Sequence, residues 1–279
     1  YNLQVLAGRD SLCYHACMIG WRARRQFIVL LIVAFPFIAI GFLFFPRLFP
    51  ESSCFDNRRN QGEFEVDCGG PCLPCELKNP KKVDLFWTKV ASAKTNVYDM
   101  VAYIENPNEI LASPRLEYEF ALFDEFGLIA RRRGHTFILV EERLYIVEPA
   151  LGTQRIPSRV EFKVLDVQWE VNTKNPLNLV TEKREYRVAG ENGKKHGVVE
   201  ASIFNRSLFD LREVEVSFTV TDKDGNILGA NKVLLEDLSS GTSKSVKSIW
   251  PEELKGEVAV INVEPRVNVF DPAVIIKPR

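Results

Sequence analysis

The sequence predicts a mainly β protein with one N-terminal transmembrane helix, a small disulfide-rich segment and two tandem antiparallel β-sandwiches. Three observations lead to this fold class. An uncharged apolar run fills residues 27–45, and four cysteines crowd into residues 54–75. From residue 80 onward, short runs of β-branched and aromatic residues alternate with turn residues. A chain of 279 residues is long enough for two ordinary domains and these additional segments.

The composition is that of a folded protein without a nucleic-acid partner. Hydrophobic residues make up 46% of the chain and charged residues 26%, which are the proportions of globular rather than disordered proteins. The formal net charge is -1, whereas nucleic-acid-binding domains usually carry a basic excess. We therefore expect no nucleic-acid partner.

The apolar run of residues 27–45 reads FIVLLIVAFPFIAIGFLFF and contains no charged or strongly polar side chain. At about 1.5 Å per residue it spans roughly 28 Å, close to a bilayer hydrocarbon core of about 30 Å. Pro36 is tolerated in a kinked membrane helix, where neighbouring groups satisfy the freed carbonyl. A cleaved signal peptide is the alternative, and the long preceding region and the missing A-x-A-like cleavage site argue against it.

Flanking charge predicts how this helix is oriented. Arg22, Arg24 and Arg25 precede it, whereas only Arg47 follows closely. Because cytoplasmic flanks carry the excess of arginine and lysine, residues 1–26 are expected to form a cytoplasmic tail. The remainder then lies on the extracellular or periplasmic side of a single-pass signal-anchor protein, and the lipid bilayer is its first expected partner.

Residues 46–79 form a cysteine-rich neck, with cysteines at Cys54, Cys68, Cys72 and Cys75. An even number of closely spaced cysteines in an oxidising compartment predicts two disulfides, in one of three connectivities. A segment of this size buries little core, so disulfides replace packing energy. The C-x-x-C pair at its end is also typical of zinc sites, but zinc usually requires a second well-spaced pair.

The neck also carries four oxygen donors at spacings of three or four residues, namely Asp56, Asn60, Glu63 and Asp67. Such residues can surround a hard cation, so a calcium site is one interpretation. The alternative is that these side chains cap turns through local hydrogen bonds. The string C-x-D-x-x-x-N-x-x-E-x-x-x-D-C-G-G-x-C resembles a short cysteine-rich motif of extracellular and surface proteins. That resemblance implies a location and a disulfide staple, not an activity.

Two sets of predicted strands follow, assigned to domains at residues 80–172 and 179–279. The first set comprises 83–90, 97–105, 116–123, 136–140, 144–147 and 160–171. The second comprises 179–188, 198–204, 214–221, 232–235, 244–250 and 258–263. Short strands at this spacing favour a sandwich in each domain.

The two sets resemble each other in three segments that occur in the same order. AYIENPN at 102–108 matches ASIFNRS at 201–207, and LEYEFALFDEFG at 116–127 matches VEVSFTVTDKDG at 214–225. VEFKVLDVQW at 160–169 is aligned with VAVINVEPRV at 258–267. The nearly constant offset indicates a tandem duplication.

Within the second match, residues 120–124 read F-x-L-F-D and residues 218–222 read F-x-V-x-D. Each follows a strand that ends in asparagine, Asn106 or Asn205, and precedes a turn glycine. This pattern resembles the FxLYD-type immunoglobulin-like domains of bacterial surface proteins, although neither copy has the tyrosine. The resemblance implies two small antiparallel immunoglobulin-like sandwiches that bind or space, without catalytic residues. Independently, two apolar residues two apart face one core, and the aspartate begins a hairpin.

The sequence contains no G-x-S-x-G elbow, H-E-x-x-H motif, phosphate loop or dinucleotide fingerprint, so we expect no enzyme. The run Arg131, Arg132 and Arg133 is interpreted as a basic hairpin tip, either solvated or in contact with an anionic surface polymer or lipid. We expect a cell-surface binding or spacer protein with an unknown protein or polymer partner and no cofactor except calcium at the neck. The alternative is a structural or regulatory subunit of a membrane or envelope complex that associates through its transmembrane helix.

Overall fold

The computed structural model describes residues 21–48, 53–191 and 194–276. Strands account for 55% of the structure and helices for 11%, which confirms the mainly β class. The chain divides into two compact units, Tyr1–Cys72 and Leu73–Arg279. Most of the predicted cytoplasmic tail, residues 1–20, lies outside the described residues.

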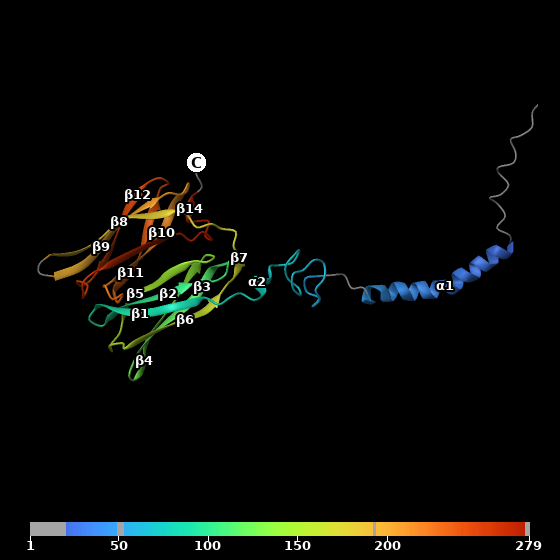
Figure 1. The fold of residues 1–279 in the computed structure, drawn as a ribbon, viewed down its shortest axis with the longest axis horizontal. Helices are drawn as coiled ribbons and strands as arrows, with labels where there is room; N and C mark the ends of the chain where they lie inside the picture. The colour runs from blue at the N-terminus through green and yellow to red at the C-terminus, as the bar shows by residue number, and fades with distance from the viewer. Residues whose placement is uncertain (1–20, 49–52, 192–193, 277–279) are drawn as a thin grey trace, which may run out of the picture. The chain divides into compact units, whose positions relative to one another are not determined.

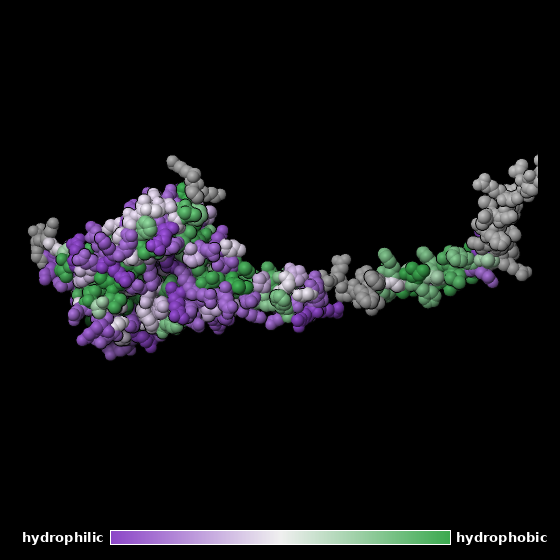
Figure 2. All heavy atoms as spheres, turned by 45° about the horizontal axis from the view of Figure 1, so that its top comes forward, coloured by the Kyte–Doolittle hydropathy of each residue, from purple (hydrophilic) through white to green (hydrophobic). Residues whose placement is uncertain are grey.

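The first unit contains the apolar helix α1 (Trp21–Leu48), which is longer at both ends than the predicted span. Its stretch Ala23–Phe44 is long and apolar enough to cross a membrane. The helix passes through Pro36 without interruption, and Figure 1 shows a bend along its length. Its apolar side chains are exposed instead of packing on a protein core, and Figure 2 shows hydrophobic residues covering it. A helix that is apolar on all sides is typical of a membrane span.

The second unit begins with the short helix α2 (Cys75–Lys78), followed by the first sandwich. One sheet has the order β1-β2-β5, with strands β1 (Asp84–Lys94), β2 (Val97–Glu105) and β5 (Arg143–Gly152). The other has the order β4-β3-β6, with β4 (Gly127–Ile138), β3 (Leu111–Asp124) and β6 (Arg159–Val167); β7 (Glu170–Val171) pairs with the start of β3. All pairs are antiparallel, and inward-facing side chains of both sheets form a common core.

The second sandwich, coloured yellow to red in Figure 1, repeats this topology strand for strand. One sheet has the order β12-β9-β8, with strands β12 (Ser243–Trp250), β9 (Lys194–Asn205) and β8 (Leu179–Glu191). The other has the order β11-β10-β13, with strands β11 (Ile227–Leu238), β10 (Asp210–Thr221) and β13 (Val260–Arg266). The short β14 (Ile275–Ile276) pairs with the start of β10, as β7 does with β3. Each predicted strand overlaps a strand of the structure, but the predicted 160–171 is divided into β6 and β7, and β4 begins at Gly127 instead of residue 136. The two-sandwich fold class is confirmed.

The duplication is visible in two asparagines, Asn106 directly after β2 and Asn205 at the end of β9. The side-chain nitrogen of Asn106 donates to two backbone carbonyl oxygens, both at 2.7 Å. Asn205 makes the equivalent pair of bonds at 2.8 and 3.1 Å. Each side-chain oxygen accepts a bond from the backbone two residues on, at Asn108 or Ser207. Both asparagines are fully buried, so each copy uses the same side chain to hold three backbone groups.

One of the three sequence alignments is wrong by three residues. Leu122 of β3 pairs with Val160, whereas the equivalent Val220 of β10 pairs with Ile261, so Val160 corresponds to Ile261 and not to Val258. The cause is a length difference in the preceding connection. Residues 251–259 join β12 to β13, nine residues against the six of 153–158 between β5 and β6.

The F-x-L-F-D segment behaves as its pattern predicts. Phe120 and Leu122 are fully buried in the first core. The Asp124 carboxylate accepts a bond from Phe126 N at 2.9 Å, and Gly127 has a φ of 114° where the hairpin closes. In the second copy the aspartate likewise begins the hairpin between β10 and β11.

Candidate functional site

The four neck cysteines all form disulfides, as predicted. Cys54 is bonded to Cys72, with their Cα atoms 5.6 Å apart, and this selects among the connectivities that spacing alone left open. Cys68 and Cys75 are also disulfide-bonded. The C-x-x-C sulfurs are therefore committed to disulfides rather than available as the thiolates that zinc binds.

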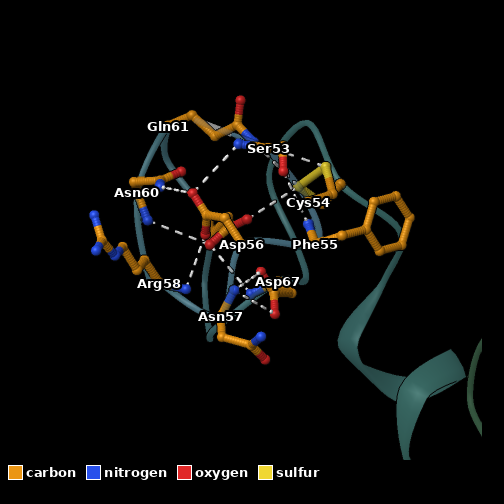
Figure 3. Close-up of a disulfide and its surroundings, with 11 residues drawn as sticks. Ser53, Cys54, Phe55, Asp56, Asn57, Arg58, Asn60, Gln61 and Asp67 are labelled. Carbon is orange, nitrogen blue, oxygen red and sulfur yellow. Dashed lines mark hydrogen bonds between the residues drawn. A yellow bond between two sulfur atoms is a disulfide. The ribbon is translucent and has the colours of Figure 1, made fainter. Parts of the chain in front are cut away.

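The predicted calcium ligands lie in the neck with this disulfide, and Figure 3 shows three of them, Asp56, Asn60 and Asp67. Asp56 accepts bonds from Arg58 N at 2.9 Å and from Asn60 Nδ2 at 2.7 Å, and the latter bond chiefly lowers the pKa of the Asp56 carboxyl. The buried Glu63 carboxylate accepts from Asn60 N and Asp67 N at 3.3 and 3.2 Å. These contacts fit the turn-capping interpretation, because three of the four donors are backbone N–H groups within four residues of the carboxylate.

One further contact joins two ends of this segment, and one buried polar atom is left without a partner in the described part of the chain. The Asp67 carboxylate accepts from Asn57 N at 3.0 Å. Asn60 Oδ1 is buried and has no hydrogen-bond partner among the described residues. The calcium site stays a prediction.

The arginine run does not form a hairpin tip. It lies inside β4, because β4 pairs with β3 from Gly127 onward and the turn is at residues 125–126. Arg131 and Arg133 pair with Glu119 at 3.8 and 2.8 Å, and Arg132 with Glu148 at 3.9 Å. The bond from Arg133 chiefly lowers the pKa of Glu119. Contact with an anionic polymer or lipid stays a prediction.

Sequence reasoning missed a buried carboxylate at the junction of the two sandwiches. Asp99 of β2 is only 2% exposed. Its Oδ1 accepts from Ala150 N at 2.9 Å within the first sandwich. Its Oδ2 accepts from Ala230 N at 3.2 Å and from Trp250 Nε1 at 3.1 Å, both in the second. Burial raises the pKa of the Asp99 carboxyl, and the three donors partly oppose that shift.

The apolar surroundings of Asp99 form a third core between the sandwiches. Outward-facing residues of the β1-β2-β5 sheet pack against β11, with Trp87 and Tyr145 at the margin. The buried members are Ala91, Val101, Val147, Ile227 and Ala230. The outer face of this sheet is therefore an intramolecular interface rather than a solvated surface.

A second polar contact joins the sandwiches through Arg266 of β13, whose side chain is 9% exposed. Its guanidinium bonds both carboxylate oxygens of Glu142 at 3.0 Å and donates to Phe137 O at 2.8 Å. It also lies over the Phe137 ring, 4.1 Å from the centroid. Planar two-point pairing of this kind fixes orientation as well as distance.

The chain matches no protein-family model and no protein in the curated set.

The junction had only a faint signature in the sequence. β2 reads VYDMVAYIE, and Asp99 is its one carboxylate before the glutamate that ends the strand. Arg266 sits in a strand with no unusual pattern, and its partner Glu142 is 124 residues away. Neither residue lies near a recognisable motif, because their roles depend on how the two copies pack.

Proposed function

We propose that this chain is a membrane-anchored, non-catalytic protein of the cell surface, in which two immunoglobulin-like sandwiches act as one rigid binding or spacing module. The observation that carries this proposal is the junction. Asp99 and Arg266 each join the two sandwiches by several hydrogen bonds, and an apolar core lies between them. Domains joined by a small polar interface usually move relative to each other, whereas a buried, apolar interface fixes their relative orientation.

The anchoring role is supported by α1 and by the neck. An exposed apolar helix of membrane-spanning length precedes a segment whose four cysteines form disulfides. Disulfides persist in oxidising compartments, which favours an extracellular or periplasmic place for residues after the helix. Arg22, Arg24 and Arg25 at the N-terminal end of α1, before its apolar stretch, favour a cytoplasmic N-terminus.

The immunoglobulin-like assignment is supported by the repeated topology and by the F-x-L-F-D and F-x-V-x-D segments, whose apolar residues fill each core. We propose on this basis that both sandwiches are FxLYD-type domains. Such domains supply surfaces for interaction rather than catalytic groups.

Protease protection tests the topology. The full chain carries one epitope tag at each end, and intact cells are exposed to protease before and after permeabilisation. We expect the C-terminal tag to be lost at once and the N-terminal tag to remain until the membrane is opened. Loss of the N-terminal tag first, or release of the chain by alkaline carbonate, contradicts the proposal.

The envelope-complex alternative is separated by exchanging α1 for an unrelated apolar helix of equal length. This variant keeps the anchor and removes the native helix surface. If crosslinked partners are retained, the sandwiches or neck bind them, as proposed. If all partners are lost while topology is unchanged, the helix-mediated alternative holds instead.

A further inference from the structure

We infer that the first sandwich binds an extended peptide strand in an apolar groove along the free edge of β6. The groove has a volume of about 580 Å³ and lies where β1 begins and β6 ends. Its apolar walls are Val83, Leu85, Ile104, Phe162, Val164 and Trp169. This inference gives the proposed binding role a ligand class, and it requires neither the membrane nor the proposed topology.

The edge of β6 presents backbone groups toward this groove. β6 is the outermost strand of the sheet β4-β3-β6. Val160 O accepts a bond of 3.3 Å from Thr88 Oγ1 of β1, so the backbone groups of Val160 point away from β3. The backbone N–H and C=O groups of successive residues point to opposite edges of a strand. The groups of Phe162 and Val164 therefore point the same way as those of Val160, into the groove. Peptides bind such edges through main-chain hydrogen bonds.

The second sandwich shows how the same place is closed when it is not a binding site. By strand register, Leu85 corresponds to Thr181 and Phe162 to Val263. Thr181 Oγ1 donates a bond of 3.1 Å to Val263 O and so joins the two sheet edges. Leucine has no hydroxyl to make this bond, and Leu85 lines the groove instead.

A second difference lies four residues earlier in each copy. Leu177 of the second sandwich packs on its core. The equivalent Lys81 lines the groove of the first sandwich and turns to Glu109, at 3.8 Å, and to Pro107 O, at 3.3 Å. The first copy therefore lacks both the bridge and the apolar cover of the second, at adjoining positions.

The groove favours one kind of ligand. Its apolar walls accept aliphatic side chains from every second residue of an extended strand. The β6 edge requires main-chain donors and acceptors, which a lipid chain does not have. Lys81 pairs with Glu109, whereas Lys82 at the rim forms no ion pair among the described residues, so an acidic residue in the peptide is favoured. The expected ligand is an extended, apolar-alternating peptide with at least one acidic side chain.

The test is selection from a phage-displayed library of random dodecapeptides against the full chain in nanodiscs, after depletion on empty nanodiscs. Selected peptides are then measured against Lys81→Leu/Leu85→Thr, which copies the closed groove of the second sandwich. The matched control, Lys223→Leu/Leu234→Thr, makes the same exchanges on the second sandwich. Thermal unfolding verifies that each variant is folded.

We expect selected peptides with alternating apolar residues, at least tenfold weaker binding to the closed variant, and unchanged binding to the control. Proline in the centre of a peptide, which removes a main-chain donor, is expected to abolish binding without any change in the protein. The proline-containing peptides test the inference even if the closed variant does not fold.

The inference is overturned if no peptide is enriched over empty nanodiscs, if the peptides bind the closed variant equally well, or if a central proline is tolerated. Displacement of the peptides by dodecanoate also overturns it, because that result would show an acyl-chain site. Dimerisation of the full chain that is lost in the closed variant assigns the groove to a second copy instead. A failed protease-protection test leaves all of these results unaffected, so the two proposals fail separately.

Discussion

Trp250 at the end of β12 donates a hydrogen bond of 3.1 Å to Asp99 of β2, across 151 residues of sequence and from one sandwich to the other. The indole nitrogen has only a donor to offer, and the buried carboxylate supplies the acceptor. Both residues are buried, at 1% and 2% exposure. The contact therefore depends on the two copies keeping one fixed arrangement.

Asp99→Asn is expected to destabilise the junction by about 1–3 kcal/mol, because one acceptor oxygen becomes an NH₂ group that faces an N–H donor. Urea unfolding of the full chain in detergent, followed by tryptophan fluorescence, measures the change. Asp210→Asn is the control, since that aspartate accepts a single bond from Ser240 N outside the junction. Equal effects of the two substitutions would show that Asp99 has no special role.

Arg266→Leu is expected to cost about 3 kcal/mol, because it leaves the Glu142 carboxylate without its charged partner and, among the described residues, with only the bond from Leu139 N in a largely buried site. The double variant Arg266→Leu/Glu142→Leu is expected to be more stable than Arg266→Leu alone. A double-mutant cycle on the unfolding free energy checks this. Strictly additive effects would mean that the two side chains do not interact.

Arg266→Lys separates charge from geometry. Lysine keeps the positive charge but loses the planar fork that bonds both oxygens of Glu142. We expect a stability between those of the wild type and Arg266→Leu. Full retention of stability would indicate that a point charge suffices and that the paired bonds and the contact with Phe137 contribute little.

The junction also predicts a pH dependence through Glu264 of β13, whose carboxylate accepts a backbone hydrogen bond from Tyr145 of β5. Burial raises the pKa of Glu264 above its ordinary value of 4.5. The folded state then binds this proton more tightly than the unfolded state, so the stability it contributes is complete below pH 4.5 and is lost as pH rises through the folded pKa. Glu264→Gln removes this dependence. Unfolding measured across pH in both proteins should show the wild type losing stability relative to the variant; parallel curves would contradict the assignment.

The Cys54–Cys72 disulfide is predicted to stabilise the neck alone. Cys54→Ser/Cys72→Ser opens a loop with a sequence separation of 18, worth about 3 kcal/mol in the chain-entropy model. Because the sandwiches belong to the other compact unit, their unfolding free energy is expected to change by less than about 0.5 kcal/mol. Limited proteolysis should cleave the neck faster in the variant. A large loss of sandwich stability would show that the two units are coupled.

Strand patterns predicted most of the fold but not the contacts between copies. The alternation of apolar and polar residues along β2 and β3 and the turn residues after Asp124 are local patterns, so the sequence alone predicts these strands and this turn. The outer residue Val101 is buried only because β11 covers it, and no local pattern specifies that cover. The arginine run was misplaced for a similar reason: charge and Gly134 suggested a turn, whereas pairing with β3 continues through both.

The central claim is that the two sandwiches form one rigid module. Pulsed electron paramagnetic resonance between nitroxide amino acids at Phe126 and Leu208, each 79% exposed and one on each sandwich, tests it most directly. A single narrow distance distribution is predicted for the wild type, with broadening in Asp99→Asn/Arg266→Leu. A distribution that is already broad in the wild type, and unchanged in that variant, would contradict the claim.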